Sequence, residues 1–276
     1  MQANAFYVAA HGVVACAYGA LAWLAWRALQ RPHRFDGRWL LPIVALAHAT
    51  LLAGAVLDHG ALRFGFAQAL SATMLFAVLI VWLEGFVVPI RGLQVLVLPV
   101  AAVASVLPAL FQGALIAVGR DSLAFRAHWF VAIAAFSLIT IAALHALLMA
   151  SMDRSLHAAA DEGAFARVLA EVPPLLAMER LLFRLLWTGF LLLTAALISG
   201  VLFTEELFGR PLRFDHKTVF TIASWLIFAG LLAGRQLFGW RGRTALRFTL
   251  VGFVLLLLAY VGSRFVLEVI LRRVAG

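Results

Sequence analysis

Long apolar segments constrain the fold of this chain more than any other feature of its sequence. A helix needs about 20 mostly apolar residues to cross the hydrocarbon core of a bilayer. Eight segments meet that length, at about residues 5–27, 39–57, 66–88, 92–111, 124–151, 180–203, 217–237 and 245–270. The sequence therefore predicts an all-α, polytopic transmembrane helix bundle of about eight spans, with no soluble domain and with residues 1–276 forming a single domain.

Composition supports a membrane location and argues against a nucleic-acid partner. The chain is 64% hydrophobic and only 13% charged, with a mean hydropathy of +1.01, which leaves too little polar surface for a water-soluble domain. The 22 Lys and Arg outnumber the 13 Asp and Glu, but these basic residues sit between apolar segments. This pattern indicates membrane topology. The partner that it implies is the lipid bilayer.

The distribution of Arg predicts the orientation of the spans. An even number of spans places both termini on one side of the membrane. Arg is more frequent in the loops around 27–38, 91, 154–180 and 235–247 than in the opposite set of loops. Because cytoplasmic loops carry the excess of basic residues, we expect these loops to be cytoplasmic and both termini to be periplasmic.

The longest polar stretch, residues 153–179, is predicted to be a cytoplasmic amphipathic connector. Leu156, Phe165 and Leu169 fall loosely on one helical face, and Pro173 stops the helix. Its charged residues are interpreted as a solvated face and not as a binding site.

Histidine is the residue type most able to carry chemistry in these spans. His48 lies about 14 Å into the second span at a rise of 1.5 Å per residue, close to the centre of the bilayer. A neutral imidazole there could ligate haem iron, bind a proton or hydrogen-bond a neighbouring helix, and the sequence leaves these roles open. His11 and His145 are weaker candidates. The single Cys16 excludes a covalent CxxCH haem site, so any haem would be held non-covalently.

Polar residues also gather at the predicted periplasmic ends of the helices. If these ends converge, imidazoles could bind haem iron and Arg side chains could bind its propionates. The alternative is an ordinary hydrated membrane edge. The residues concerned are Asp58, His59, Arg126, His128, Glu205, Glu206, Asp215, His216, Arg264 and Glu268.

Motifs for catalysis and for transport are missing from the sequence. It contains no GxSxG, no HExxH and no glycine-rich phosphate loop, so we expect that the protein is not an enzyme. The spans show no inverted repeat with broken helices, so a small-molecule transporter has the least support.

Three segments resemble one known family. They are HWFVAIAAFSLITIAALHALLMASMDRSL at 128–156, PPLLAMERLLF at 173–183, and residues 216–266 with Trp225, a GWRGR turn at 239–243 and AYVGSRF at 259–265. With these segments the chain resembles the cytochrome c assembly protein family, a polytopic group that includes CcsA-type proteins. It is most similar to the HemX/YpjD-type branch of the bacterial inner membrane.

The resemblance implies a haem-associated protein of cytochrome c assembly, with membrane proteins of cytochrome maturation as partners. By position, His128 is similar to the family's outer histidine and His48 to an intramembrane histidine of this branch. We hypothesise an outer haem-iron site at His128 and His216, with anion partners Arg126, Arg210 and Arg213.

One departure from the family pattern limits this prediction. Haem-exporting members carry a tryptophan-rich WWD motif before the penultimate helix, whereas the loop from Phe203 to Thr218 contains no Trp. The predicted role is therefore accessory. The alternative function is a non-haem scaffold that binds a membrane partner through its helix faces.

Overall fold

The computed structural model describes residues 2–30, 39–58, 61–86, 91–116, 123–157, 175–208, 216–262 and 265. Its helices are α1 (Gln2–Gln30), α2 (Leu41–Val56), α3 (Phe66–Glu84), α4 (Arg91–Leu110), α5 (Leu123–His157), α7 (Leu175–Phe208), α8 (His216–Phe238) and α9 (Arg243–Leu257), which continues into the π-helix η2 (Leu258–Gly262). Three short strands, β1 (Leu57–Asp58), β2 (Ala61–Phe64) and β3 (Ala114–Ile116), complete the described part.

The predicted helical membrane bundle is confirmed. Seven of the helices are long and apolar enough to cross a membrane, and they coincide with seven of the eight predicted spans. The eighth, α2, has only 16 residues, because the chain leaves the helix at Leu57 to enter β1. The helix still carries His48 near its middle.

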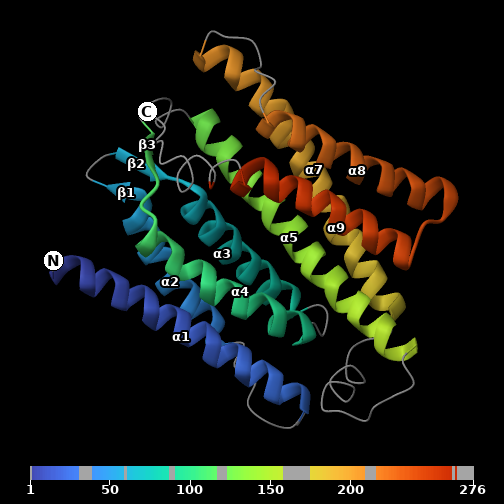
Figure 1. The fold of residues 1–276 in the computed structure, drawn as a ribbon, viewed down its shortest axis with the longest axis horizontal. Coiled ribbons are helices and arrows are strands. Elements are labelled where there is room, and N and C mark those ends of the chain that lie inside the picture. Colours follow the sequence, from blue (N-terminus) through green and yellow to red (C-terminus); the bar gives the residue numbers. More distant parts are fainter. Residues whose placement is uncertain are drawn as a thin grey trace.

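The helices form two groups that meet along α5 (Figure 1). In the first group, α1 packs mainly on α4, and α3 packs on both α2 and α4. In the second, α7 and α9 pack on α5, and α8 packs on α9. Contacts of α5 with α3 and α4 join the groups, and the hydroxyl of Ser137 in α5 donates to the carbonyl of Thr73 in α3 at 3.0 Å. Helix α5 therefore packs against helices of both groups.

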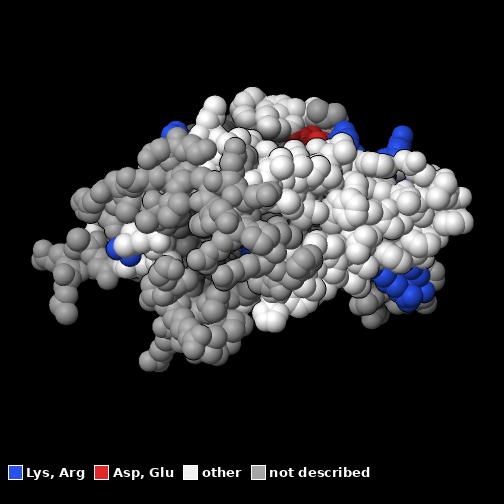
Figure 2. Space-filling model, turned by 90° about the horizontal axis from the view of Figure 1, so that it is seen from above, with Lys and Arg blue, Asp and Glu red and all other residues white. Residues whose placement is uncertain are grey.

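Small residues allow the helices to approach closely, as is usual where helices pack in lipid. Ala77, Ala101 and Ala142 are fully buried. At the contact of α5 with α7, a Cβ added to Gly189 would lie only 3.0 Å from the side chain of Ile139. The outer faces instead expose large apolar side chains such as Leu191 and Leu226. Among the described residues in Figure 2 most of the surface is uncharged, and Lys and Arg appear in a few separate places toward the margin of the view.

A three-stranded antiparallel sheet caps one end of the first group, in the order β1-β2-β3. Gln68 fixes this cap, because its Oε1 accepts the N–H of Gly65 at 3.0 Å and its Nε2 donates to the carbonyl of Phe111 at 2.8 Å. Gly113 has a φ of 70°, and a Cβ there would lie 2.7 Å from the nitrogen of Gly65. This position therefore requires glycine.

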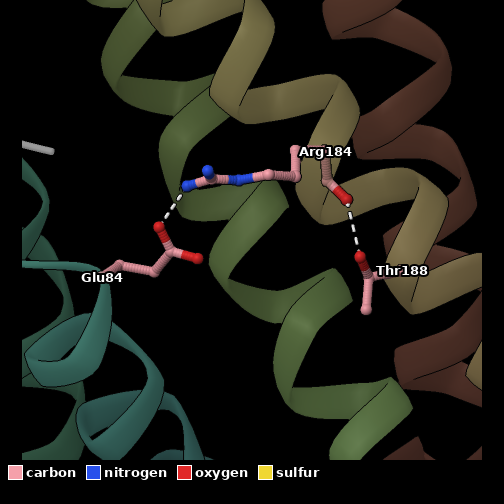
Figure 3. Close-up of polar contacts among 3 residues, drawn as sticks. All are labelled: Glu84, Arg184 and Thr188. Carbon is pink, nitrogen blue, oxygen red and sulfur yellow. Dashed lines mark hydrogen bonds and ion pairs between the residues drawn. The ribbon is translucent and has the colours of Figure 1, made fainter. Parts of the chain in front are cut away.

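Ion pairs tie helices together at the opposite end of the bundle. Glu84 at the end of α3 pairs with Arg184 of α7, whose carbonyl also accepts the hydroxyl of Thr188 (Figure 3). Two further pairs join α7 to α8 and α5 to α9. They are Glu179 with Arg235, at 2.5 Å, and Asp153 with Arg243, at 3.5 Å.

The structure revises the ends of the predicted connector. Residues 153–157 belong to α5 and residues 175–179 belong to α7, because both helices continue beyond the apolar segments that define the spans. Asp153, which the sequence places on a solvated face, is held in an ion pair with Arg243 of α9, and Glu179 is paired with Arg235 of α8. The predicted amphipathic helix between them falls on residues 158–174, which lie outside the described residues.

Candidate functional site

His48 lies fully buried among α1, α2 and α3. Its Nδ1 is 3.2 Å from the hydroxyl of Tyr18, and its Nε2 is 2.8 Å from the hydroxyl of Ser71. Both ring nitrogens therefore have partners, each on a different neighbouring helix. Of the roles that the sequence leaves open, this is the geometry of an interhelical hydrogen bond, and a metal ion would have to displace one hydroxyl.

His11 has the opposite arrangement, with one ring nitrogen bonded and the other without a partner. Its Nδ1 contacts the backbone carbonyl of Ser105 in α4. A carbonyl only accepts, so Nδ1 carries the proton and Nε2 carries the lone pair. The side chain is fully buried, and Nε2 has no hydrogen-bond partner. Histidines that ligate metals are commonly held this way, with the other ring N–H donated to a carbonyl.

A second unpartnered group lies next to the imidazole of His11. The ring of Tyr7 packs edge-on against it with ring centroids 4.6 Å apart, and the buried hydroxyl of Tyr7 has no partner. Tyr7, His11 and Tyr18 are spaced by four and seven residues, which places them on one face of α1. His11 is also close enough to His48 for the two imidazoles to interact electrostatically. The first helix group therefore has a polar interior. Tyr7 and Tyr18 were not predicted to belong to it, although their spacing from His11 indicates that they share its helical face.

His128 lies near the start of α5, half-buried against α7. Its Nδ1 is 2.8 Å from the hydroxyl of Ser199, which donates to the carbonyl of Ala195 at 2.7 Å. When the Ser199 hydroxyl donates to Ala195, Nδ1 is the donor to Ser199 and Nε2 carries the lone pair. A Cβ at Gly200 would lie 3.4 Å from Cε1 of His128, so the absence of a side chain there leaves room beside the ring.

The start of α8 lies close to His128. The ammonium group of Lys217 interacts electrostatically with His128 and lies 5.4 Å from the ring centroid of Tyr260. His216, the first residue of α8, is exposed, as is Arg126 near the start of α5. The structure thus brings the starts of α5 and α8 to the same end of the bundle. Several predicted residues lie outside the described residues: His59, Arg210, Arg213, Asp215, Arg264 and Glu268.

His145 is buried between α5 and α7 near the end that carries the ion pairs. Its Nε2 donates to the carbonyl of Met178 at 2.9 Å, and its Nδ1 has no partner. Across the described residues, no group of three or more His, Cys, Asp or Glu side chains could hold a metal ion. A metal in this part of the protein would need fewer such ligands or ligands of another kind.

Comparison with known proteins identifies the family. The profile of the family described as "Cytochrome C assembly protein" matches residues 12–271, nearly the whole chain. The chain belongs to the cytochrome c assembly protein family. Family membership and the apolar helices together establish a multi-pass membrane protein. No solved structure matches the chain.

Curated relatives agree with this assignment. "Inner membrane protein YpjD" of Escherichia coli (strain K12) is 36% identical over 143 residues, and an "Uncharacterized 28.8 kDa protein in nifR3-like 5'region" of Azospirillum brasilense is 35% identical over 146. Each match covers 52% of this chain and 52% of the relative, so it spans about half of the relatives' length. A "Cytochrome c biogenesis protein CcsA" of Prochlorococcus marinus is 35% identical over 88 residues, which is 32% of this chain and 28% of the relative.

Proposed function

We propose that this protein is a haem-associated inner-membrane protein that acts in cytochrome c biogenesis. Its family and the name of the CcsA relatives support a role in that process. The loop before α8 contains no Trp, which supports an accessory role without enzymatic activity. Its partners in this proposal are haem and other membrane proteins of cytochrome maturation.

The observation that carries the haem proposal is the orientation of the His128 imidazole. With the Ser199 hydroxyl donating to Ala195, Nδ1 holds the proton and the lone pair lies on Nε2, as an axial ligand of haem iron requires. The ring is half-buried at the helix ends, where the guanidinium of Arg126 is exposed and can meet a propionate. Bound haem would supply an iron atom for this ligation, while the residues of the chain orient the ring.

His11 is a second imidazole with the same tautomer, and its Nε2 is buried without a partner. An unsatisfied buried polar group costs about 1–3 kcal/mol, which a ligand at that nitrogen would remove. His48 differs, since hydroxyl groups occupy both of its nitrogens. These arrangements favour His128 and His11 over His48 as haem ligands, and His216 stays a prediction.

A hemin titration of the purified protein tests the proposal. We expect the parent to develop a Soret band, His128→Gly to lose or shift it, and added imidazole to restore it by occupying the vacated space. His48→Leu is the control, because it removes an imidazole whose two nitrogens already have hydroxyl partners, and it should load haem like the parent. Gel filtration and circular dichroism would confirm that each variant is folded.

Two outcomes would contradict the haem proposal. A parent protein without any Soret band would favour the alternative, a non-haem scaffold that binds a membrane partner. A His128→Gly variant with an unchanged band, and no response to imidazole, would exclude His128 as the axial ligand. The same titration on His11→Phe would then show whether the buried imidazole serves instead.

A further inference from the structure

The imidazole of His145 is held in one tautomer with a buried, unused lone pair. Nε2 lies 2.9 Å from the carbonyl oxygen of Met178, and because a carbonyl cannot donate, Nε2 carries the proton. Nδ1 therefore carries the lone pair. It has no hydrogen-bond partner, and the side chain is only 3% exposed. Leaving such an atom unsatisfied in a protein interior is unfavourable, so the position calls for an explanation.

Three buried methionines occupy the same stretch of α5 and α7 as this imidazole. Met149 and Met152 follow His145 on α5 by four and seven residues, which places them on the same helical face. Met178 belongs to the facing helix α7, and its own carbonyl accepts the His145 proton. All three are buried, with exposed fractions of 3%, 7% and 3%. Along the helix axis, Met149 thus lies about 6 Å and Met152 about 10.5 Å from His145.

The chemistry of these ligands selects a particular class of metal. Thioether sulfur and neutral imidazole are soft or intermediate ligands that favour Cu(I) over Mg²⁺, Ca²⁺ or Mn²⁺. The carboxylates that directly follow Met152 and Met178 in sequence are Asp153 and Glu179, and they form ion pairs with Arg243 and Arg235. A set of uncharged ligands suits a monovalent ion in an apolar interior, because a higher charge would be left uncompensated there.

Methionine also fills gaps in ordinary cores, and packing alone could explain three such residues. Packing does not explain the lone pair of His145, since an apolar core disfavours an unsatisfied polar atom. Histidine ligands of metals characteristically donate their other N–H to a backbone carbonyl, as His145 does to Met178. The combination of oriented imidazole and nearby sulfur therefore points to a ligand.

We propose that His145, Met149, Met152 and Met178 form a binding site for a soft monovalent metal ion of the Cu(I) class. The site lies between α5 and α7 near the end of the bundle that carries the ion pairs. Met178 is in the first turn of α7, and Met152 is five residues before the end of α5. An ion could therefore reach the site from that end of the helices. The site is separate from His128, so it does not depend on haem binding.

Cu(I) competition tests the site on the full-length protein in detergent. Haem-free protein would be mixed with a chromophoric Cu(I) chelator under reducing conditions, and transfer of the metal followed by absorption. Met149→Leu, Met152→Leu and Met178→Leu remove sulfur while keeping volume, alone and combined. Mutating residues that only orient metal ligands typically lowers metal affinity about 10–100-fold. We expect the combined variant, which removes three ligands, to lose at least about that much Cu(I) affinity. Met74→Leu is the matched control, because Met74 is equally buried but lies on α3.

X-ray absorption at the copper edge provides a readout that a purely structural role would not affect. Sulfur neighbours in the parent, lost in the combined variant, would support the site. The proposal is overturned if the parent takes no Cu(I) from the chelator, if the combined variant binds like Met74→Leu, or if the copper spectrum contains only nitrogen or oxygen neighbours. If the combined variant does not fold, the single variants and the parent spectrum decide the question.

Discussion

Replacement of Gly252 by alanine is a sharp test of how α8 and α9 pack. A Cβ at this position would lie 2.7 Å from Cζ of Phe228 and 2.9 Å from its Cε1. Ordinary carbon contacts are about 3.5–4.0 Å, so the ring or the helix would have to move by roughly 1 Å. Phe228 is only 1% exposed, and the Ser224 hydroxyl ties α8 to the Gly252 carbonyl at 2.8 Å. Neither helix can therefore yield easily.

The expected loss of stability follows from two opposing terms. Overpacking costs about 1–3 kcal/mol. Replacing glycine by alanine in a helix returns up to about 1 kcal/mol. We therefore expect Gly252→Ala to lower the free energy of unfolding by up to about 2 kcal/mol, as the difference of these terms. The measurement is reversible unfolding in mixed micelles, followed by circular dichroism.

Two further variants make this reasoning refutable. Gly230→Ala on α8 is the control, because nothing lies within 4 Å of the added Cβ, and its stability should stay constant or rise. Phe228→Leu should relieve the clash, so Gly252→Ala should cost less in that background, with a coupling energy of about 0.5–3 kcal/mol. Equal stability of the two alanine variants, or a purely additive double-mutant cycle, would refute the packing argument.

Three other changes test separate contacts by the same unfolding assay. His48→Leu should destabilise the protein by about 1–3 kcal/mol, because the two hydroxyls it bonds lose their partner; an unchanged midpoint would contradict the interhelical role. Arg184→Gln should cost only about 0–1 kcal/mol, since its pair with Glu84 is partly exposed, and high salt should remove the difference. Gly234→Ala should destabilise more than Gly230→Ala, because its Cβ would lie 2.3 Å from the Trp240 ring; the reverse order would exclude that contact.

Helix positions could be predicted from the sequence because membrane spans depend on a local property, the length of an apolar segment. The residues at which the helices begin and end could be predicted less well. Helix α2 ends at Val56, where the chain enters β1, and α7 already includes Leu175, ahead of the apolar segment that predicts its span. The small sheet was not predicted, because strands of two to four residues carry too short a pattern to distinguish them from loops.

The histidines of the spans could be picked out from the sequence, but their contacts could not. His48 stands out in sequence as a polar residue deep in a span, yet its partners Tyr18 and Ser71 come from α1 and α3. His11 could be weighed only after packing placed the Ser105 carbonyl against it. Protonation of each imidazole depends on such long-range partners, so no local pattern could distinguish the satisfied ring from the unsatisfied one.

The polar interior of the first helix group has a consequence for biosynthesis. The bonds from His11 to Ser105 and from Tyr18 through His48 to Ser71 join only residues that precede α5. These helices can therefore complete their own hydrogen bonds during translation, before Leu123 leaves the ribosome. Helix α5 then meets a group of helices that is already formed, and the inserting chain does not have to hold the His48 imidazole without hydrogen bonds in lipid until synthesis is finished.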